Sequence, residues 1–113
     1  TKAARNKVKA AKLSEEAAQL NVKAADQQLK MQLLQYQEAF KKQQQLVQYY
    51  NNEGLAQSAL IIRHAGLNFE KGQISYLEWT MLMNNATGIQ LARLDALAQL
   101  NRIRTEIEYL TGK

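Results

Sequence analysis

The fold is decided by the stretch Phe69-Glu70-Lys71-Gly72-Gln73-Ile74-Ser75-Tyr76-Leu77-Glu78-Trp79, which ends one helix and begins another within a few residues. Gly72 suits the left-handed conformation that follows a helix, and Lys71 complements the carbonyl end of the helix dipole. Ser75 is a favourable N-cap, and Glu78 stands at the third helical position, where it completes a capping box. About two residues separate the stop signal of the first helix from the start signal of the second. A loop this short requires the two helices to lie antiparallel.

The turn carries a second capping signal. Ile74 and Trp79 occupy the two positions of a hydrophobic staple, in which an apolar residue before the N-cap packs against one in the first helical turn. We therefore expect a tip turn over residues 72–75, and we expect it to be capped by Ser75, Glu78, Ile74 and Trp79.

Before the turn, helical periodicity extends from about residue 3 to residue 71. One apolar seam consists of two rows in steps of seven, which are Val8, Glu15, Val22, Leu29, Tyr36, Gln43 and Tyr50, with Ala11, Ala18, Ala25, Gln32, Ala39 and Leu46 beside them. A second seam on another side contains Leu13, Ala17, Leu20, Ala24, Met31 and Leu34. A helix with two apolar seams needs two helical neighbours, as in a bundle or a closed wall of helices.

The weakest part of this helix is residues 51–54, Asn-Asn-Glu-Gly, because asparagine and glycine each cost a helix roughly 0.5 to 1 kcal/mol. We expect a kink or a loosened turn there, and a true break is the alternative. Periodicity resumes with Leu55, Ala59, Ile62, Ala65 and Phe69.

The second helix is expected over about residues 76–110, ending before Gly112. Its apolar row contains Leu82, Ile89, Ala96, Ile103 and Leu110, flanked by Ala86, Leu100 and Ile107, and a second seam contains Leu91, Leu94 and Ala98. Gly88 costs a helix about 1 kcal/mol relative to alanine, and it suggests a close approach of the two helices. Since each helical residue advances about 1.5 Å, the second helix covers the first only from about Tyr36 to Lys71. Residues before about Gln35 need a partner from elsewhere.

Composition favours helix, because alanine, leucine and glutamine are abundant and proline is absent. Cysteine is absent too, and no apolar run is long enough to span a membrane. The formal net charge is +5, with an excess of basic residues before Glu15. Clustered lysines could neutralise nucleic-acid phosphates, but this stretch has no interleaved aromatic residues, and a solvated helix end is the favoured interpretation.

No residue constellation suited to catalysis or metal binding is recognisable. His64 is the only histidine, and neither Glu53 nor Glu70 lies within one helical turn of it. Met81 and Met83 are two residues apart and point in different directions on a helix, so packing explains them better than capture of a soft metal. The sequence therefore predicts a protein that is not an enzyme, with no catalytic residues, cofactor or metal.

The turn resembles the TolC-like outer-membrane efflux family, whose helical hairpins carry the signature Tyr/Phe-x-x-Gly-x-x-Ser/Thr-hydrophobic-hydrophobic-Asp/Glu at the periplasmic tip. Here the signature reads from Phe69 to Glu78. The segments Arg5-Asn6-Lys7-Val8-Lys9-Ala10-Ala11 and Glu108-Tyr109-Leu110-Thr111-Gly112 resemble the family's descending and returning helices. The closest resemblance is to the outer-membrane components of heavy-metal efflux systems, although those usually carry proline where this chain has Ala56.

The resemblance implies a single periplasmic helical hairpin domain over residues 1–113, belonging to a larger bacterial outer-membrane protein. It implies that the helices form part of a tunnel and that the tip docks a periplasmic adaptor, which connects to an inner-membrane pump. By position, the docking residues would be Lys71, Gly72, Gln73, Ile74 and Ser75. The residues themselves leave a second interpretation open, in which the chain is a self-associating scaffold that forms an antiparallel four-helix bundle as a dimer. A nucleic-acid-binding helix pair is a distant third.

Overall fold

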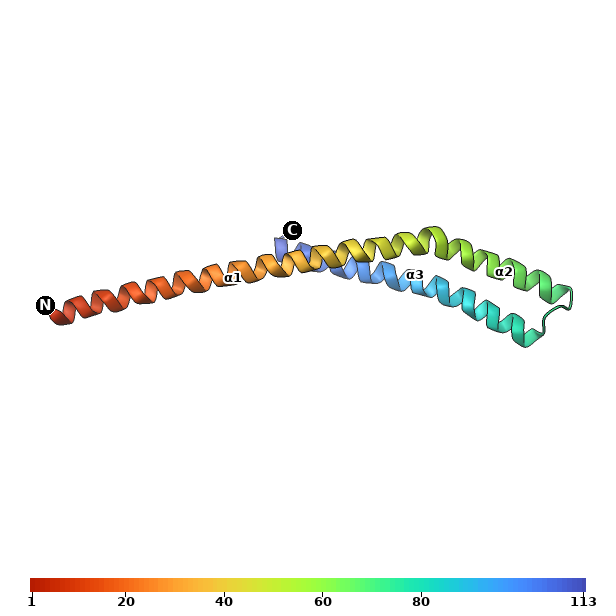
Figure 1. The fold of residues 1–113 in the computed structure, drawn as a ribbon, viewed down its shortest axis with the longest axis horizontal. Helices are drawn as coiled ribbons and strands as arrows, with labels where there is room; N and C mark the ends of the chain where they lie inside the picture. The colour runs from red at the N-terminus through yellow and green to blue at the C-terminus, as the bar shows by residue number, and fades with distance from the viewer. The chain divides into compact units, whose positions relative to one another are not determined.

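The computed structural model describes all residues from 1 to 113, and it consists of helices with no strand. The elements in chain order are α1 (Lys2–Tyr49), the π-helical turn η1 (Tyr50–Gly54), α2 (Leu55–Glu70) and α3 (Tyr76–Thr111). The first three follow one another without a gap, so the predicted long helix and the antiparallel helix after the turn are both confirmed (Figure 1).

The chain divides into two compact units, residues 1–36 and residues 37–113. The first unit is a stretch of α1 alone, here called the arm. Every residue of the arm up to Gln32 is exposed to solvent. The two apolar seams expected for this region therefore lie in the open, as the length argument predicted.

In the second unit, the last part of α1, together with η1 and α2, lies beside α3, and the turn after Glu70 joins α2 to α3 (Figure 1). The core at the open end of this hairpin is small. It consists of Val47, Ala96 and Leu100, with Phe40, Tyr50 and Leu97 packed against them. A side-chain hydrogen bond crosses the same region, where the Gln43 Nε2 group donates to the Ala96 carbonyl oxygen at 3.0 Å.

Nearer the turn, the contact between α2 and α3 is built from small side chains. Ala65 and Ala86 are buried, and Ser58 is 0% exposed. The Ser58 Oγ group donates a hydrogen bond to the Ala86 carbonyl oxygen at 3.1 Å. A buried hydroxyl is costly unless it is bonded, and here the opposite helix supplies the acceptor.

The π-helical turn η1 confirms the loosened turn that was expected near residues 51–54. The row facing α3 takes a step of seven from Gln43 to Tyr50, and then a step of eight to Ser58 and a step of seven to Ala65. A π turn closes its hydrogen bonds from i to i+5 instead of i+4, so it holds an extra residue in one turn. The turn therefore absorbs the additional residue and keeps one face directed at α3.

This shift in register corrects two of the expected rows. After η1 the inward positions are Ser58, Ile61, Ala65 and Asn68, whereas Leu55, Ala59, Ile62 and Phe69 are exposed. Before η1 the companion of the Tyr36–Tyr50 row is Phe40 with Val47, since Val47 is 6% exposed while Leu46 is 43% exposed.

On α3 most of the expected row is confirmed. Ala86, Ala96 and Leu100 are buried, and Ile89, Ile103, Ile107 and Leu110 are half-buried. The expectation of a close helix approach at Gly88 is wrong, because a Cβ atom added there would meet nothing within 4 Å. The crowded glycine is Gly54, where an added Cβ would lie 3.0 Å from Cδ1 of Tyr50 in the same turn and 3.6 Å from Ile89 Cγ2 of α3.

Candidate functional site: the hairpin tip

The end of α2 is closed by two backbone hydrogen bonds that together form a Schellman motif. The Gly72 N–H donates to the Phe69 carbonyl at 3.0 Å, and the Gln73 N–H donates to the Asn68 carbonyl at 2.9 Å. Gly72 has a φ of +72°, in the left-handed region where glycine lacks the steric penalty of other residues. The sequence-based expectation for Gly72 is confirmed.

The start of α3 is closed by a reciprocal pair of hydrogen bonds. The Glu78 N–H donates to Ser75 Oγ at 3.1 Å, and the Ser75 N–H donates to Glu78 Oε1 at 3.3 Å. Ser75 has an extended backbone, as an N-cap residue should. This is the predicted capping box, and it places a carboxylate at the positive end of the α3 dipole.

These two caps determine what the tip presents to solvent. Lys71, Gly72, Gln73 and Ser75 are exposed, and Ile74 is half-buried. All five residues expected at the docking tip therefore lie in the turn between the helices. Because the backbone on both sides is fixed by hydrogen bonds, the exposed groups sit on a rigid support.

An aromatic cluster lies behind the turn, and it is the feature that sequence reasoning missed. The Trp79 and Phe69 rings stack with their centroids 5.4 Å apart. The Tyr76 ring lies 5.9 Å from Trp79 and 6.2 Å from Phe69. Such offset or tilted pairs each contribute about 0.5–1.5 kcal/mol beyond burial. Trp79 thus packs across the hairpin onto α2, while its staple with Ile74 stays a prediction. Aromatic residues on both sides of a tight turn were the available signal.

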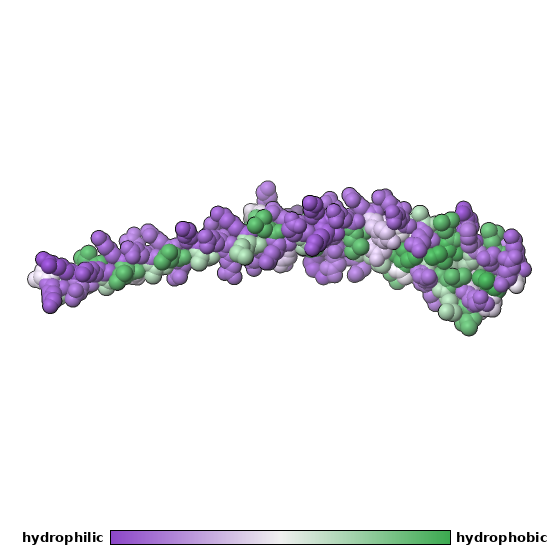
Figure 2. All heavy atoms as spheres, in the orientation of Figure 1, coloured by the Kyte–Doolittle hydropathy of each residue, from purple (hydrophilic) through white to green (hydrophobic).

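Around this cluster several apolar side chains are open to solvent. Tyr76 and Leu77 are each 68% exposed, and Leu67 and Met81 are also exposed. Figure 2 shows hydrophobic residues gathered over α2 and α3 near the turn, with hydrophilic residues between them. Exposed apolar patches of this kind are typical of interaction sites.

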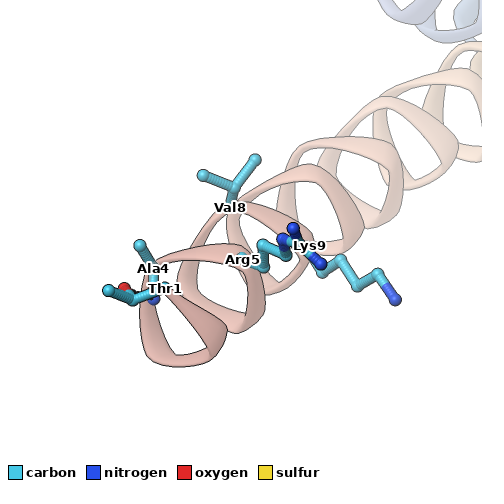
Figure 3. A pocket seen from close by; sticks show the side chains of 5 residues that line it. All are labelled: Thr1, Ala4, Arg5, Val8 and Lys9. Atoms are coloured by element: carbon cyan, nitrogen blue, oxygen red, sulfur yellow. Dashed lines mark hydrogen bonds between the residues drawn. The ribbon is translucent and has the colours of Figure 1, made fainter.

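The hollows in the surface do not make a binding cavity. One of them is lined by Thr1 and by Ala4, Arg5, Val8 and Lys9 from the first turns of α1 (Figure 3). No second element closes over these side chains. A small-molecule site normally buries most of its ligand, so a hollow along one helix offers too little contact.

Nowhere do three or more histidine, cysteine, aspartate or glutamate side chains come together in a way that could hold a metal ion. His64 is exposed, Met81 is exposed and Met83 is half-buried, so the two methionines do not share an environment. No helix combines the length and the apolar character that crossing a bilayer requires.

Comparison with protein-family models, with curated proteins and with solved structures finds no match to this chain.

Proposed function

We propose that this hairpin is the tip-bearing segment of an efflux conduit, and that residues Lys71–Ser75 dock a periplasmic adaptor protein that links it to an inner-membrane pump. The observation that carries the proposal is the tip itself. A cap on each side fixes its backbone, and four of its five residues are exposed. The signature from Phe69 to Glu78 resembles the docking tips of TolC-like efflux proteins, including those of heavy-metal systems.

The two exposed apolar seams of the arm also support this proposal. Val8, Val22 and Leu29 lie on one seam, and Leu13 and Leu20 lie on the other. These side chains are all exposed in the chain by itself. A helix inside a closed wall contacts a neighbour on each side, so two open seams are what such a position requires. Under this proposal the hairpin has a structural role and performs no catalysis.

The proposal is tested by a pair of glycine variants in the full-length parent protein. Gly72 and Gly112 both have positive φ, and an added Cβ meets nothing within 4 Å at either one. Asparagine tolerates this conformation better than most residues, so Gly72→Asn and Gly112→Asn should cost similar stability. Only the first places a new side chain at the tip.

We expect Gly72→Asn to reduce cross-linking to the adaptor and to reduce efflux about tenfold or more, because a side chain in a close backbone contact prevents docking. Gly112→Asn should leave both near the level of the unmodified protein. Equal effects of the two variants, or normal efflux with Gly72→Asn, would refute a docking role for the tip.

A second candidate, a self-associating scaffold, is favoured by one specific observation. The arm is exposed along its whole length up to Gln32, although it carries the spacing of a helix that pairs.

A further inference from the structure

The arm contains a sequence repeat whose residues pack against no other helix of the chain. Four consecutive heptads carry an alanine pair at the same two positions, Ala3-Ala4, Ala10-Ala11, Ala17-Ala18 and Ala24-Ala25. A strict repeat of seven residues predicts a helix that supercoils to the left around a partner helix. All of these alanines are exposed, so the pairing helix is not supplied by this chain.

One face of this repeat has the side-chain sizes of a close helix–helix contact. We call it the alanine seam, and it alternates the larger residues Val8, Glu15, Val22 and Leu29 with Ala4, Ala11, Ala18 and Ala25. Val22 is 71% exposed, and Val8 and Leu29 are exposed as well. In coiled-coil packing a large side chain enters a space on the facing helix, and an alanine leaves such a space.

We propose that the occupant of the alanine seam is a second copy of this chain, running antiparallel. The orientation follows from side-chain size and charge. A parallel pair in register would place Glu15 against Glu15 of the second copy and would bring Lys7 beside Lys12. An antiparallel pair places each larger residue opposite an alanine, so no two like charges face each other in the core.

Side-chain size and charge together assign the register. The positions on one flank of the seam are Arg5, Lys12, Gln19 and Asp26, of which Asp26 is the only acid. When Val8 faces Ala25 of the second copy, Arg5 lies opposite Asp26, and the two-fold axis repeats that pair. In the present structure Asp26 forms an ion pair with Lys30 of its own helix, at 3.0 Å, and both side chains are exposed. An exposed pair of this kind is weak and can be exchanged for another.

The neighbouring registers are less favourable. A shift of one heptad in one direction places Lys12 opposite Lys12 of the second copy. A shift in the other direction pairs Lys12 with Asp26, but it places Gln32 against Val8 and Leu33 beside Arg5, so a large polar side chain replaces an alanine in the seam. The assigned register uses residues 4–29 only, and it leaves the hairpin and its tip free.

This inference is independent of the proposed docking function, and different residues test the two. The docking proposal is tested at Gly72 in the turn and the pairing at residues of the arm, so the failure of one does not overturn the other.

Sedimentation equilibrium of the full chain, with charge-swap variants, tests the assigned register. We expect a dimer, and we expect Arg5→Glu alone to weaken association about tenfold, because it faces Asp26 with a like charge twice. The double variant Arg5→Glu/Asp26→Lys should recover the original dissociation constant. A monomer at every concentration overturns the pairing, and a failure of the double variant to recover overturns the register.

A matched pair of seam variants tests which face is used. Val22 lies on the alanine seam and Leu20 on the opposite seam of the arm, and both are more than 60% exposed. Val22→Asp should abolish the dimer while Leu20→Asp leaves it intact, and circular dichroism should show the same helix content in both. Loss of the dimer with Leu20→Asp, or its survival with Val22→Asp, would exclude the alanine seam.

Discussion

At the scale of single residues, small side chains determine how closely the two helices of the hairpin approach. Ser58, Ala65 and Ala86 fill the contact near the turn, and Gly54 fills it at the end of η1. Two of these positions would be difficult to enlarge. Ser58 is fully buried and uses its hydroxyl across the interface, and Gly54 lies against the Tyr50 ring.

Gly54 and Gly88 form a matched pair for measuring this constraint. Gly88→Ala should raise the free energy of unfolding by about 0.5–1 kcal/mol, because alanine favours helix and its Cβ enters open space. Gly54→Ala should lower the free energy of unfolding by about 1 kcal/mol, because its Cβ would lie 3.0 Å from the Tyr50 ring in a packed cluster. Urea unfolding followed by circular dichroism measures both changes.

The informative result is whether the two variants change the free energy of unfolding in opposite directions. If both glycine variants stabilise the hairpin equally, the Tyr50 ring moves aside freely and Gly54 does not limit the helix approach.

At the scale of elements, the π turn explains why the long helix keeps its face toward α3. The residue facing α3 advances by eight across η1 and by seven on both sides of it. A side-chain hydrogen bond links this turn to α3, where Arg93 Nε donates to Asn51 Oδ1 at 2.6 Å. The extra residue is therefore held inside a turn that is packed against its neighbour.

Removing one residue from η1 should restore a regular helix. Deletion of Asn52 brings Tyr50, Ser58 and Ala65 to a spacing of seven, so the same side chains still face α3. We expect the variant to unfold cooperatively with nearly unchanged stability. Deletion of the exposed Arg63 is the control, since it rotates the end of α2 by about 100° and should cost roughly 2 kcal/mol or more.

Thermal unfolding of the two deletion variants gives a direct comparison. A stability loss with the Asn52 deletion as large as that with the Arg63 deletion would show that the π turn does more than absorb a residue.

The helices and the turn could be predicted from sequence because their signals are local. Gly72 stops one helix, Ser75 with Glu78 starts the next, and each signal lies within four residues of the group it caps. The inward face of α2 could not be predicted, because a π turn shifts this face by one residue. The asparagine and glycine residues at 51–54 indicate that the helix is weak there, but they do not indicate a π turn. The stacking of Phe69 on Trp79 depends on two helices meeting, which local pattern does not describe.

At the scale of the whole molecule, apolar surface is distributed unequally between the two units. The hairpin unit buries Val47, Ala96 and Leu100 in its own core, whereas the arm buries none of its apolar side chains. The contacts within the chain therefore bury only part of its apolar surface. Both the docking proposal and the antiparallel pairing supply contacts that the chain lacks.

The hairpin core contains no ion pair, since the only one in the molecule joins Asp26 to Lys30 on the arm. Dissolved electrolyte screens exposed charges over distances of about 10 Å and has little effect on buried apolar contacts. The melting temperature of the hairpin should therefore change by less than about 2 °C between 0.05 and 0.5 M sodium chloride. Calorimetry would detect a larger shift. A hairpin assembled in this way keeps its shape when the ionic composition of its surroundings fluctuates.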